Sequence, residues 1–357
     1  MAPEKPPRKP PVETAVPPIP GAPAVALPMG TAPAAGAQMP WYRRLWEGTV
    51  ALRASRVGMV GFVIVAFWAL VAILGPALAR YDPSDQVVAP IPKGVTILDL
   101  PPGAFPSTKP YRADNPATPE DETILGYVLA NSGPSSAAWL GTDDRGRDVY
   151  SRLVIGARQV MTIAPLSILI GAVIGILLGL AAGYYGGWID EILMRILDAI
   201  IAFPIIVVLL LIVSSIGASR VTVIAAIAVA SIPGVARLAR SLTLDLRTRD
   251  YVAAARLRGE SAMYIMVREI FPNASGPIII DLTLRVGYAV FAIATLGFLG
   301  LGLPPPTPDW GTMVAEGRNF VTANAWAALF PAAAIATLVV GLNLMADGIR
   351  QESARYR

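Results

Sequence analysis

Six stretches of this chain are apolar and long enough to cross a lipid bilayer, and they restrict the possible folds more than any other feature. A membrane-spanning helix needs about 20 mostly apolar residues. Segments of about that length lie at 58–79, 161–184, 193–215, 220–237, 276–302 and 325–347. Inside a bilayer the backbone polar groups must be satisfied internally, and segments of this length achieve that as helices. We therefore expect an all-α membrane protein with six transmembrane helices.

Composition agrees with a lipid environment and excludes several kinds of chemistry. Charged residues make up only 15% of the 357 residues, against about 25% in soluble domains. The chain has no cysteine and no histidine, which excludes disulfides, thiolate metal sites and Ser-His-Asp catalysis. No lysine stands in a Gly-Lys-Ser/Thr pattern, so a phosphate-binding P-loop is absent. We expect no catalytic residue, no metal site and no cofactor bound by this chain.

The remaining residues divide into segments of different character. Residues 1–40 are rich in Pro and Ala without any helical or strand period, which predicts a disordered tail. Residues 41–57 mix arginines with aromatic and apolar side chains, as an interfacial amphipathic helix does. The Pro-rich loop 80–160 is expected to be irregular or to form a small folded cap. Five of the six spans then lie within 161–350, interrupted by a polar loop at 238–275.

Arginine is concentrated in the connection between the fourth and fifth apolar segments. The arginines there are Arg237, Arg240, Arg247, Arg249, Arg256, Arg258 and Arg268. Short loops rich in Arg and Lys remain in the cytoplasm. We therefore expect this loop and both termini in the cytoplasm, and loop 80–160 outside. Since the positive charges flank apolar segments, the net charge of +4 does not indicate a nucleic-acid partner.

The second apolar segment carries glycine at every fourth position. These glycines are Gly171, Gly175, Gly179 and Gly183. Residues four apart share one face of a helix, so the glycines form a stripe without side chains. Such a stripe lets a neighbouring helix approach closely in a membrane, and tight helix packing is favoured over a role in binding a substrate.

Ionisable side chains are rare within the apolar segments. Asp281 and Arg285 are four residues apart in the fifth segment and are expected to pair on one helix face. A proton-coupled carrier typically needs buried carboxylates or a relay. An interfacial or cavity-lining ion pair is therefore favoured over a proton relay.

The arginine-rich loop predicts a helical hairpin. Asp250 is expected to cap a short helix that ends at Leu257, followed by Gly259 in a left-handed turn. Ser261 can cap a second helix that ends at Pro272. The alanines at 253–255 keep the first helix slim, so that it can fit a groove on another protein. The alternative is an interfacial helix that lies on lipid.

The hairpin resembles the coupling loop of bacterial ABC-importer permeases. That motif runs Glu-Ala-Ala, three residues, Gly, and later Ile-Leu-Pro. The matching residues here are Ala254, Ala255, Gly259, Ile270, Pro272 and Asn273. The family's usual glutamate is replaced by Ala253. In a helix capped by Asp250, that glutamate would stand at the third position and complete a capping box.

Two further stretches are similar to one branch of the family. Residues 139–158 and 298–311 resemble the dipeptide, oligopeptide and nickel importers, and the entry to the first span resembles their C-type permease subunit. The resemblance extends from about residue 41 to the C-terminus. It implies the type I ABC-importer permease fold, in the cytoplasmic (inner) membrane of a bacterium, with a core permease domain at 161–350.

The resemblance also implies partner subunits and a role for each of them. A sister permease would form the other half of the pathway, two cytoplasmic ATPase subunits would use ATP and Mg, and an extracytoplasmic binding protein would deliver substrate. Peptides are the expected substrates; nickel or another small solute is the alternative. The residues expected to couple to the ATPase are Asp250, Tyr251, Ala253, Ala254, Ala255, Arg256, Gly259, Ser261, Ile270, Pro272 and Asn273.

The stretch before the second span has a functional interpretation, in which it forms an outer gate or a contact for the binding protein. Its residues are Gly141, Thr142, Asp143, Gly146, Arg147, Asp148 and Arg152. The structural interpretation is a rigid loop held by ion pairs of Asp143 or Asp148 with Arg147 or Arg152. At the level of the whole protein, the competing class is a carrier that works without an ATPase.

Overall fold

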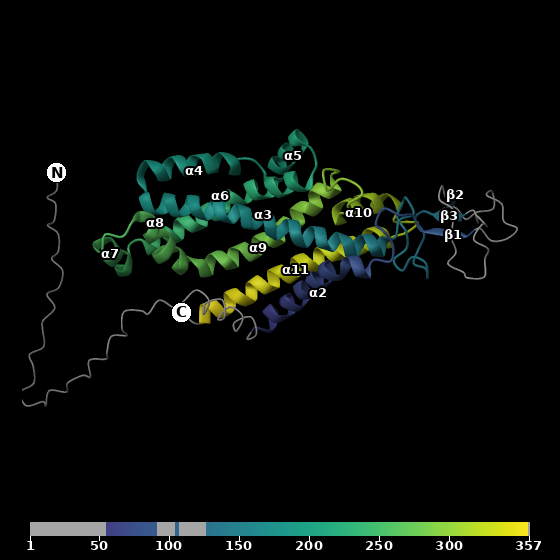
Figure 1. Cartoon of the computed structure of the whole chain (residues 1–357), viewed down its shortest axis with the longest axis horizontal. Coiled ribbons are helices and arrows are strands. Elements are labelled where there is room, and N and C mark those ends of the chain that lie inside the picture. The colour runs from purple at the N-terminus through teal and green to yellow at the C-terminus, as the bar shows by residue number, and fades with distance from the viewer. Residues whose placement is uncertain (1–54, 91–103, 107–125, 356–357) are drawn as a thin grey trace, which may run out of the picture. The chain divides into compact units, whose positions relative to one another are not determined.

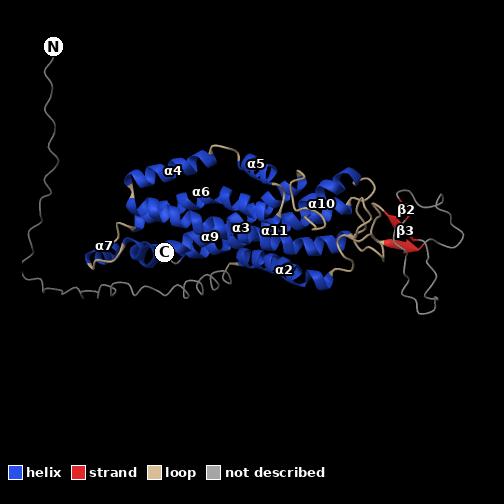
Figure 2. Ribbon diagram, turned by 45° about the horizontal axis from the view of Figure 1, so that its top comes forward, coloured by secondary structure: helices blue, strands red, loops and turns tan. Residues whose placement is uncertain are grey.

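The computed structural model describes residues 55–90, 104–106 and 126–355. The predicted tail at 1–40 and all but the end of the predicted amphipathic helix at 41–57 lie outside the described residues. The described part is mostly helical, as expected (Figures 1 and 2). Its longer helices are α2 (Arg56–Leu78), α3 (Val149–Tyr185), α4 (Gly187–Ile201), α5 (Ile205–Ile216), α6 (Arg220–Leu246), α9 (Phe271–Phe298) and α11 (Trp326–Arg355).

Short helical elements connect the longer ones. They are α7 (Asp250–Leu257), α8 (Ala262–Tyr264), the π-helix η2 (Ile265–Ile270), α10 (Trp310–Gly317) and the 3-10 helix η3 (Arg318–Phe320). By length and composition, five helices among the described residues can cross a membrane, or six spans if the bent pair α4 and α5 is one. In this count α8, η2 and α9 form one continuous helix, Ala262–Phe298.

The third span is not the single helix that was expected at 193–215. It is broken into α4 and α5, whose axes meet at 84°. The break falls at Phe203 and Pro204. Proline has no backbone N–H and disfavours the helical conformation of the residue before it, so the helix ends there. The apolar run continues through this point, which is why hydropathy alone did not reveal the break.

The helices extend beyond the apolar segments that predicted them. Helix α3 begins at Val149, so the last part of the expected loop 80–160 is helical. Asp148 caps this helix by accepting a hydrogen bond from the Ser151 backbone N–H at 2.9 Å. Helix α6 likewise continues to Leu246, past the expected start of loop 238–275. Polar and charged residues in these extensions end the apolar run without ending the helix.

The segment between α2 and α3 contains a small antiparallel sheet rather than irregular structure alone. Its strands are β1 (Val88–Pro90), β2 (Ala104–Pro106) and β3 (Gly126–Leu129). Strand β3 is central, in the order β1-β3-β2. In this register Val88 and Phe105 both lie opposite Val128, whose side chain is fully buried.

Helices α3 and α6 approach closely along the glycine stripe. At Gly175, a Cβ atom would lie 2.9 Å from both the Ile232 carbonyl oxygen and the Val235 Cβ. The other three glycines also face α6: Gly171 faces Ala228 and Ser231, Gly179 faces Ala236 and Ala239, and Gly183 faces Arg240 and Thr243. A side chain at any of these positions would push the two helices apart.

The first and last described spans, α2 and α11, pack side by side (Figure 1). Gly61 lies against the α11 backbone around Gly341, where it leaves no room for a side chain. Trp68 of α2 donates from Nε1 to Thr337 Oγ1 at 3.1 Å, and its ring meets that of Trp310 edge-on at a centroid distance of 4.9 Å. Aromatic pairs of this geometry add stability beyond their buried area, so Trp68 joins α2 to α11 and to the start of α10.

Candidate functional site

The arginine-rich hairpin lies at the end of the spans opposite the strands. Helix α7 follows α6 and is succeeded by α8 and η2, which lead into α9 (Figure 1). Arg247 ties the base of the hairpin to α3, because its Nη1 donates to the Gly183 carbonyl at 2.8 Å. That carbonyl lies in the last turn of α3, where backbone acceptors lack partners within the helix.

Gly259 forms the bend between the two arms. Its φ of 79° is in the left-handed region, and a Cβ there would meet nothing within 4 Å. The Gly259 N–H donates to the Arg256 carbonyl at 3.0 Å, and the Glu260 N–H donates to the Ala255 carbonyl at 3.2 Å. This pair of bonds is the Schellman motif, in which glycine is preferred because of its positive φ. Glycine is thus required here by the backbone conformation, and not by crowding.

The start of α7 differs from the expectation by one residue. The N-cap is Arg249, and Asp250 is the first residue of the helix. Asp250 still suits this place, because a carboxylate in the first turn interacts favourably with the helix dipole. Ala253 consequently occupies the fourth helical position, while the third is the buried Val252. A glutamate at 253 would therefore not complete a capping box, and that account of the motif is wrong for this chain.

One face of α7 is held firmly by the rest of the protein. Val252 and Ala255 are fully buried and pack with Ile265, Ile270 and Leu180. Two cations reinforce this anchoring: the Arg256 guanidinium lies 5.2 Å from the Tyr184 ring centre, and Arg258 forms an ion pair with Glu269 at 3.4 Å. Helix α7 is thereby attached to α3 and to η2.

The opposite face of the hairpin is exposed and partly apolar. Ala253 and Ala254 lie on this face of α7. Leu257, at the end of the helix, is 90% exposed, and Met263 is 62% exposed. Exposed apolar side chains surrounded by arginines are typical of a surface that contacts another molecule.

The second arm continues directly into a transmembrane span. Ser261 caps it as expected, accepting from the Tyr264 N–H at 3.2 Å. Pro272, however, does not end the helix: it stands in the first turn of α9. The preceding turn is widened, since the Phe271 N–H donates to the Met266 carbonyl. A proline ring crowds the carbonyl four residues earlier in a regular α-helix, and the π-turn just before Pro272 changes that spacing.

Tyr251 and Asn273 lie within the anchored part of the hairpin. Asn273 Nδ2 donates to the Glu269 carbonyl at 2.7 Å, across the widened turn. Burial raises the pKa of the Tyr251 phenol above its usual range, so this residue stays neutral at physiological pH. Both side chains therefore stabilise the hairpin's junction with α9, and neither lies on its exposed apolar face.

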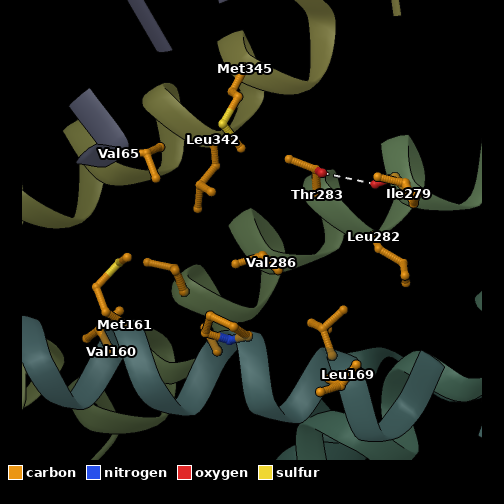
Figure 3. A pocket seen from close by; sticks show the side chains of 14 residues that line it. Val65, Val160, Met161, Leu169, Ile279, Leu282, Thr283, Val286, Leu342 and Met345 are labelled. Carbon is orange, nitrogen blue, oxygen red and sulfur yellow. Dashed lines mark hydrogen bonds between the residues drawn. The ribbon is translucent and has the colours of Figure 1, made fainter. Parts of the chain in front are cut away.

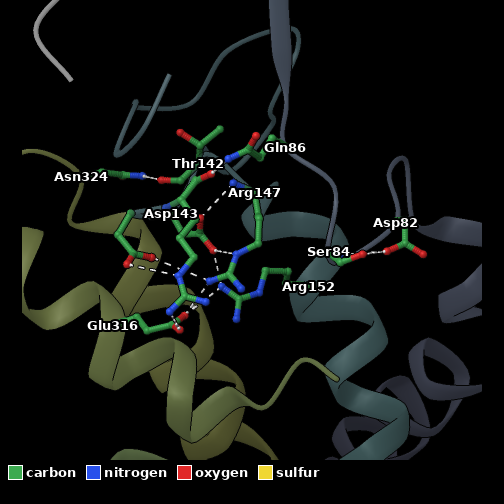
Figure 4. Close-up of polar contacts among 11 residues, drawn as sticks. Asp82, Ser84, Gln86, Thr142, Asp143, Arg147, Arg152, Glu316 and Asn324 are labelled. Carbon is green, nitrogen blue, oxygen red and sulfur yellow. Dashed lines mark hydrogen bonds and ion pairs between the residues drawn. The ribbon is translucent and has the colours of Figure 1, made fainter. Parts of the chain in front are cut away.

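A second group of charged residues lies at the other end, where residues 141–152 meet α10 (Figure 4). Asp143 accepts from Arg147 Nε at 2.7 Å and from Arg152 Nη1. Glu316 of α10 binds Nη2 of Arg147 and Nη1 of Arg152, each at 3.0 Å. Asp143 and Arg152 are almost completely buried. Two carboxylates and two guanidinium groups thus hold the loop against α10, which agrees with the interpretation of this stretch as a rigid loop.

The sequence missed several residues of this second charged group, the Asp143–Glu316 cluster. Glu316 was not expected, and neither was Asn324, whose Nδ2 donates to the Thr142 and Ser132 carbonyls at 2.9 Å. Asp148 forms no ion pair among the described residues and is instead the α3 N-cap. Since Glu316 and Asn324 lie more than 160 residues beyond Arg147, Arg152 and Thr142, which they bind, no local pattern could have identified them.

Asp309 fixes the turn before α10. It caps α10 by accepting from the Gly311 N–H at 2.7 Å and also accepts from the Leu303 N–H at 3.2 Å. Burial raises the pKa of the Asp309 carboxyl above its usual value. Its bonds explain the Pro- and Gly-rich stretch around it as a stabilised turn.

Asp281 and Arg285 pair as expected, with Arg285 Nε 2.5 Å from Asp281 Oδ2. The Arg285 guanidinium lies over Gly234 of α6, where a Cβ would be 2.6 Å from Nη1. Arg285 and Tyr288 also line a recess of about 240 Å³ between α3, α5, α6 and α9. The pair therefore lies at a junction of helices, and its Arg285 lines a cavity.

Comparison with known proteins identifies the family. The family described as binding-protein-dependent transport system inner membrane component matches residues 175–353. The N-terminal transmembrane domain of oligopeptide transport permease C matches residues 40–102. The dipeptide transport system permease protein DppC of Haemophilus influenzae is 35% identical over 298 residues, which is 84% of this chain and 90% of that protein. The chain belongs to the family of binding-protein-dependent transport system inner membrane components.

Other relatives of this permease carry related names. The glutathione transport system permease protein GsiD of Pectobacterium atrosepticum is 41% identical over 241 residues, covering 68% of the permease and 77% of that protein. The DppC protein of Alkalihalophilus pseudofirmus is 34% identical over 299 residues, or 84% and 86% of the two chains. A solved structure of the MetNI methionine ABC transporter in inward facing conformations matches at 20% identity, over 58% of the permease and 97% of that chain. Its TM-score to the permease is 0.47.

Proposed function

We propose that this permease is one half of the translocation pathway of an ATP-driven importer for peptides, and that the α7 hairpin is where the ATPase docks. The relatives are named for dipeptide and glutathione transport. The observation that carries the docking proposal is the two-sided hairpin. One face is buried in the permease, and the other presents Ala253, Ala254 and Leu257 to a partner.

The anchored face supports a role in transmitting motion. Val252 and Ala255 pack on Leu180 of α3 and on η2, and η2 continues into α9 without a break. Arg247 binds the last turn of α3 from the end of α6. A displacement of the hairpin would therefore reach α3, α6 and α9 together. Packed helices shift as rigid units, so a change in the ATPase dimer would alter the equilibrium between inward-facing and outward-facing states.

The same proposal assigns the partners and the orientation. Two cytoplasmic ATPase subunits hold ATP and Mg, a sister permease completes the pathway, and an extracytoplasmic binding protein delivers peptides. The hairpin and both termini lie in the cytoplasm, because the arginines are concentrated at that end. Residues 141–152 and α10 then face the outside of the inner membrane, where the ion pairs of Asp143 and Glu316 keep a rigid surface for the binding protein.

Co-purification tests the proposal. A tagged permease is extracted from its native membrane in mild detergent, and the accompanying proteins are identified by mass spectrometry. We expect a second permease and P-loop ATPases, and we expect Ala254→Arg to remove the ATPases while the sister permease remains. Ala323→Arg is the matched control, since Ala323 is an exposed alanine in the loop after η3, at the other end of the spans. A permease that purifies alone and moves peptides in liposomes without ATP would instead be a carrier.

Orientation has a separate test, made simple by the absence of native cysteine. Ser261→Cys places a single thiol in the exposed part of the hairpin. A membrane-impermeant maleimide should label it in inverted membrane vesicles and leave it unlabelled in intact spheroplasts. The reverse labelling pattern would contradict the proposed orientation.

A further inference from the structure

Two arginines without acidic partners lie at the end of the spans away from the hairpin. Arg158 is near the start of α3, and Arg220 is the first residue of α6. Both side chains are exposed. Among the residues that the structure describes, neither forms an ion pair with Asp or Glu. Unpaired guanidinium groups beside apolar helices attract an anion from outside the chain.

Thr162 joins the two arginines. Its Oγ1 donates to the Arg158 carbonyl at 2.7 Å and accepts from Arg220 Nη2 at 2.8 Å. Arg220 is thereby drawn from α6 toward α3, to the side chain one turn beyond Arg158. The two positive charges and the hydroxyl form one polar group at the ends of neighbouring helices.

An apolar hollow begins at this polar group. A recess of about 380 Å³ between α2 and α3 is lined by Ala69, Ala72, Ile73, Arg158, Met161 and Thr162. A second hollow of about 360 Å³ lies between α2, α3, α9 and α11 (Figure 3). Met161 lines both, so the two adjoin.

The second hollow offers no free polar side chain. Its lining is aliphatic or Met, apart from Thr283, whose Oγ1 donates to the Ile279 carbonyl of its own helix at 2.9 Å (Figure 3). On α3 the combined lining extends from Arg158 to Leu169, which is about 16 Å at 1.5 Å per residue. One leaflet of the hydrocarbon core is about 15 Å thick, half of about 30 Å. The two hollows together are therefore long enough for one acyl chain, and the second hollow has the apolar lining that such a chain needs.

We propose that this groove binds one anionic phospholipid from the leaflet opposite the hairpin. The phosphate lies between Arg158 and Arg220 with the Thr162 hydroxyl beside it, and one acyl chain passes Met161 into the apolar hollow. Phosphate oxygens bind guanidinium groups through strong charge-assisted hydrogen bonds, and the planar guanidinium matches the geometry of a phosphate. The inference depends on membrane insertion, and it is independent of the substrate and of the ATPase.

Native mass spectrometry tests the site. The complex is reconstituted in nanodiscs of phosphatidylglycerol or phosphatidylcholine, released gently, and the retained lipid is counted. Arg158→Gln and Arg220→Gln should each lower phosphatidylglycerol retention about fivefold, and together about 25-fold. The corresponding lysine variants should restore most of it. Arg318→Gln is the matched control, because Arg318 is also exposed at this end of the spans and lies over Phe298, away from the groove.

A second variant examines the acyl-chain part independently. Ala69→Phe fills the recess from α2 and should expel the lipid although both arginines remain. Equal retention of phosphatidylglycerol by the unaltered complex and by the double glutamine variant would overturn the proposal. So would equal retention of phosphatidylcholine and phosphatidylglycerol by the unaltered complex. Crosslinking of Ala69→Cys to another subunit would show that protein, rather than lipid, fills the groove.

Discussion

Leu257 offers the sharpest test of the docking surface, because almost none of its side chain is used by the permease itself. It stands at the end of α7 and is 90% exposed. Replacing it by alanine leaves the helix intact, since both residues are strong helix formers. The permease alone should therefore keep its thermal stability. Any effect of Leu257→Ala must appear only when a partner covers the side chain.

The size of that effect follows from the buried area. Truncation to alanine removes three carbon atoms, and each buried methylene contributes about 0.8 kcal/mol. If docking buries the whole side chain, Leu257→Ala weakens binding by about 2.4 kcal/mol, which is about a 60-fold rise in Kd. The detergent-solubilised permease is titrated with its purified ATPase subunits, and biolayer interferometry measures the binding. A melting curve of the permease alone is recorded as well.

The control is Val321→Ala, which truncates a half-exposed apolar side chain in the loop after η3. It should leave the Kd for the ATPase unchanged. An unchanged Kd for Leu257→Ala would place Leu257 outside the docking surface and refute the assignment of this face. A lowered melting temperature of the permease alone would show that Leu257 supports the fold instead.

Four further predictions concern the hairpin, the Asp143–Glu316 cluster and the contact between α3 and α6. Gly259→Pro cannot adopt the φ of 79° and should abolish substrate-stimulated ATPase activity without preventing membrane insertion; Gly259→Asn, which tolerates this conformation, should retain most of the activity. Arg152→Met leaves the buried Asp143 short of a partner and should lower the free energy of unfolding by about 3–5 kcal/mol, measured by denaturant titration. Burial and neighbouring carboxylates raise the pKa of Asp144 above 3.8, so ionisation of this carboxyl destabilises the fold as pH rises past 3.8. The variant Asp144→Asn should therefore have a higher melting temperature than the unaltered protein at pH 7. The difference in melting temperature should vanish below pH 3.8. Gly175→Ala should cost about 1–3 kcal/mol by overpacking the contact with α6, and an unchanged melting temperature would show that the helices separate freely.

The hairpin shows which features can be predicted from residues that are close together in the sequence. The caps and the glycine bend depend on residues only a few positions apart, so Ser261 and Gly259 could be placed from the sequence. Asp250 was misplaced by one residue, because either of two adjacent residues can begin a helix and the choice depends on how α7 packs. Pro272 was misread for a related reason: the widened turn before it is set by the buried contacts of Ile265 and Ile270, which the local sequence does not disclose.

The broken third span and the Asp143–Glu316 cluster depend on contacts between residues still further apart in the sequence. Hydropathy measures how apolar a segment is, and the segment containing α4 and α5 is apolar on both sides of its bend. Helix α4 packs on α6 where Leu197 meets Ile232 and Ala236, and Asp198 of α4 pairs with Arg237 of α6 at 2.6 Å. In the Asp143–Glu316 cluster, Glu316 binds Arg147 and Arg152, which lie far earlier in the chain, and only folding brings them together.

Local sequence was enough to predict membrane-spanning helices, the bend of the hairpin, and the stripe of α3 that accepts a close neighbour. These properties follow from composition, from backbone preferences and from the helical period, all of which act over a few residues. The bend of the third span, the acidic partners of the arginines, and the apolar groove between α2 and α3 became visible only in the folded protein. Each of these depends on side chains from separate helices meeting in space, and their positions are set by the packing of the whole set of helices.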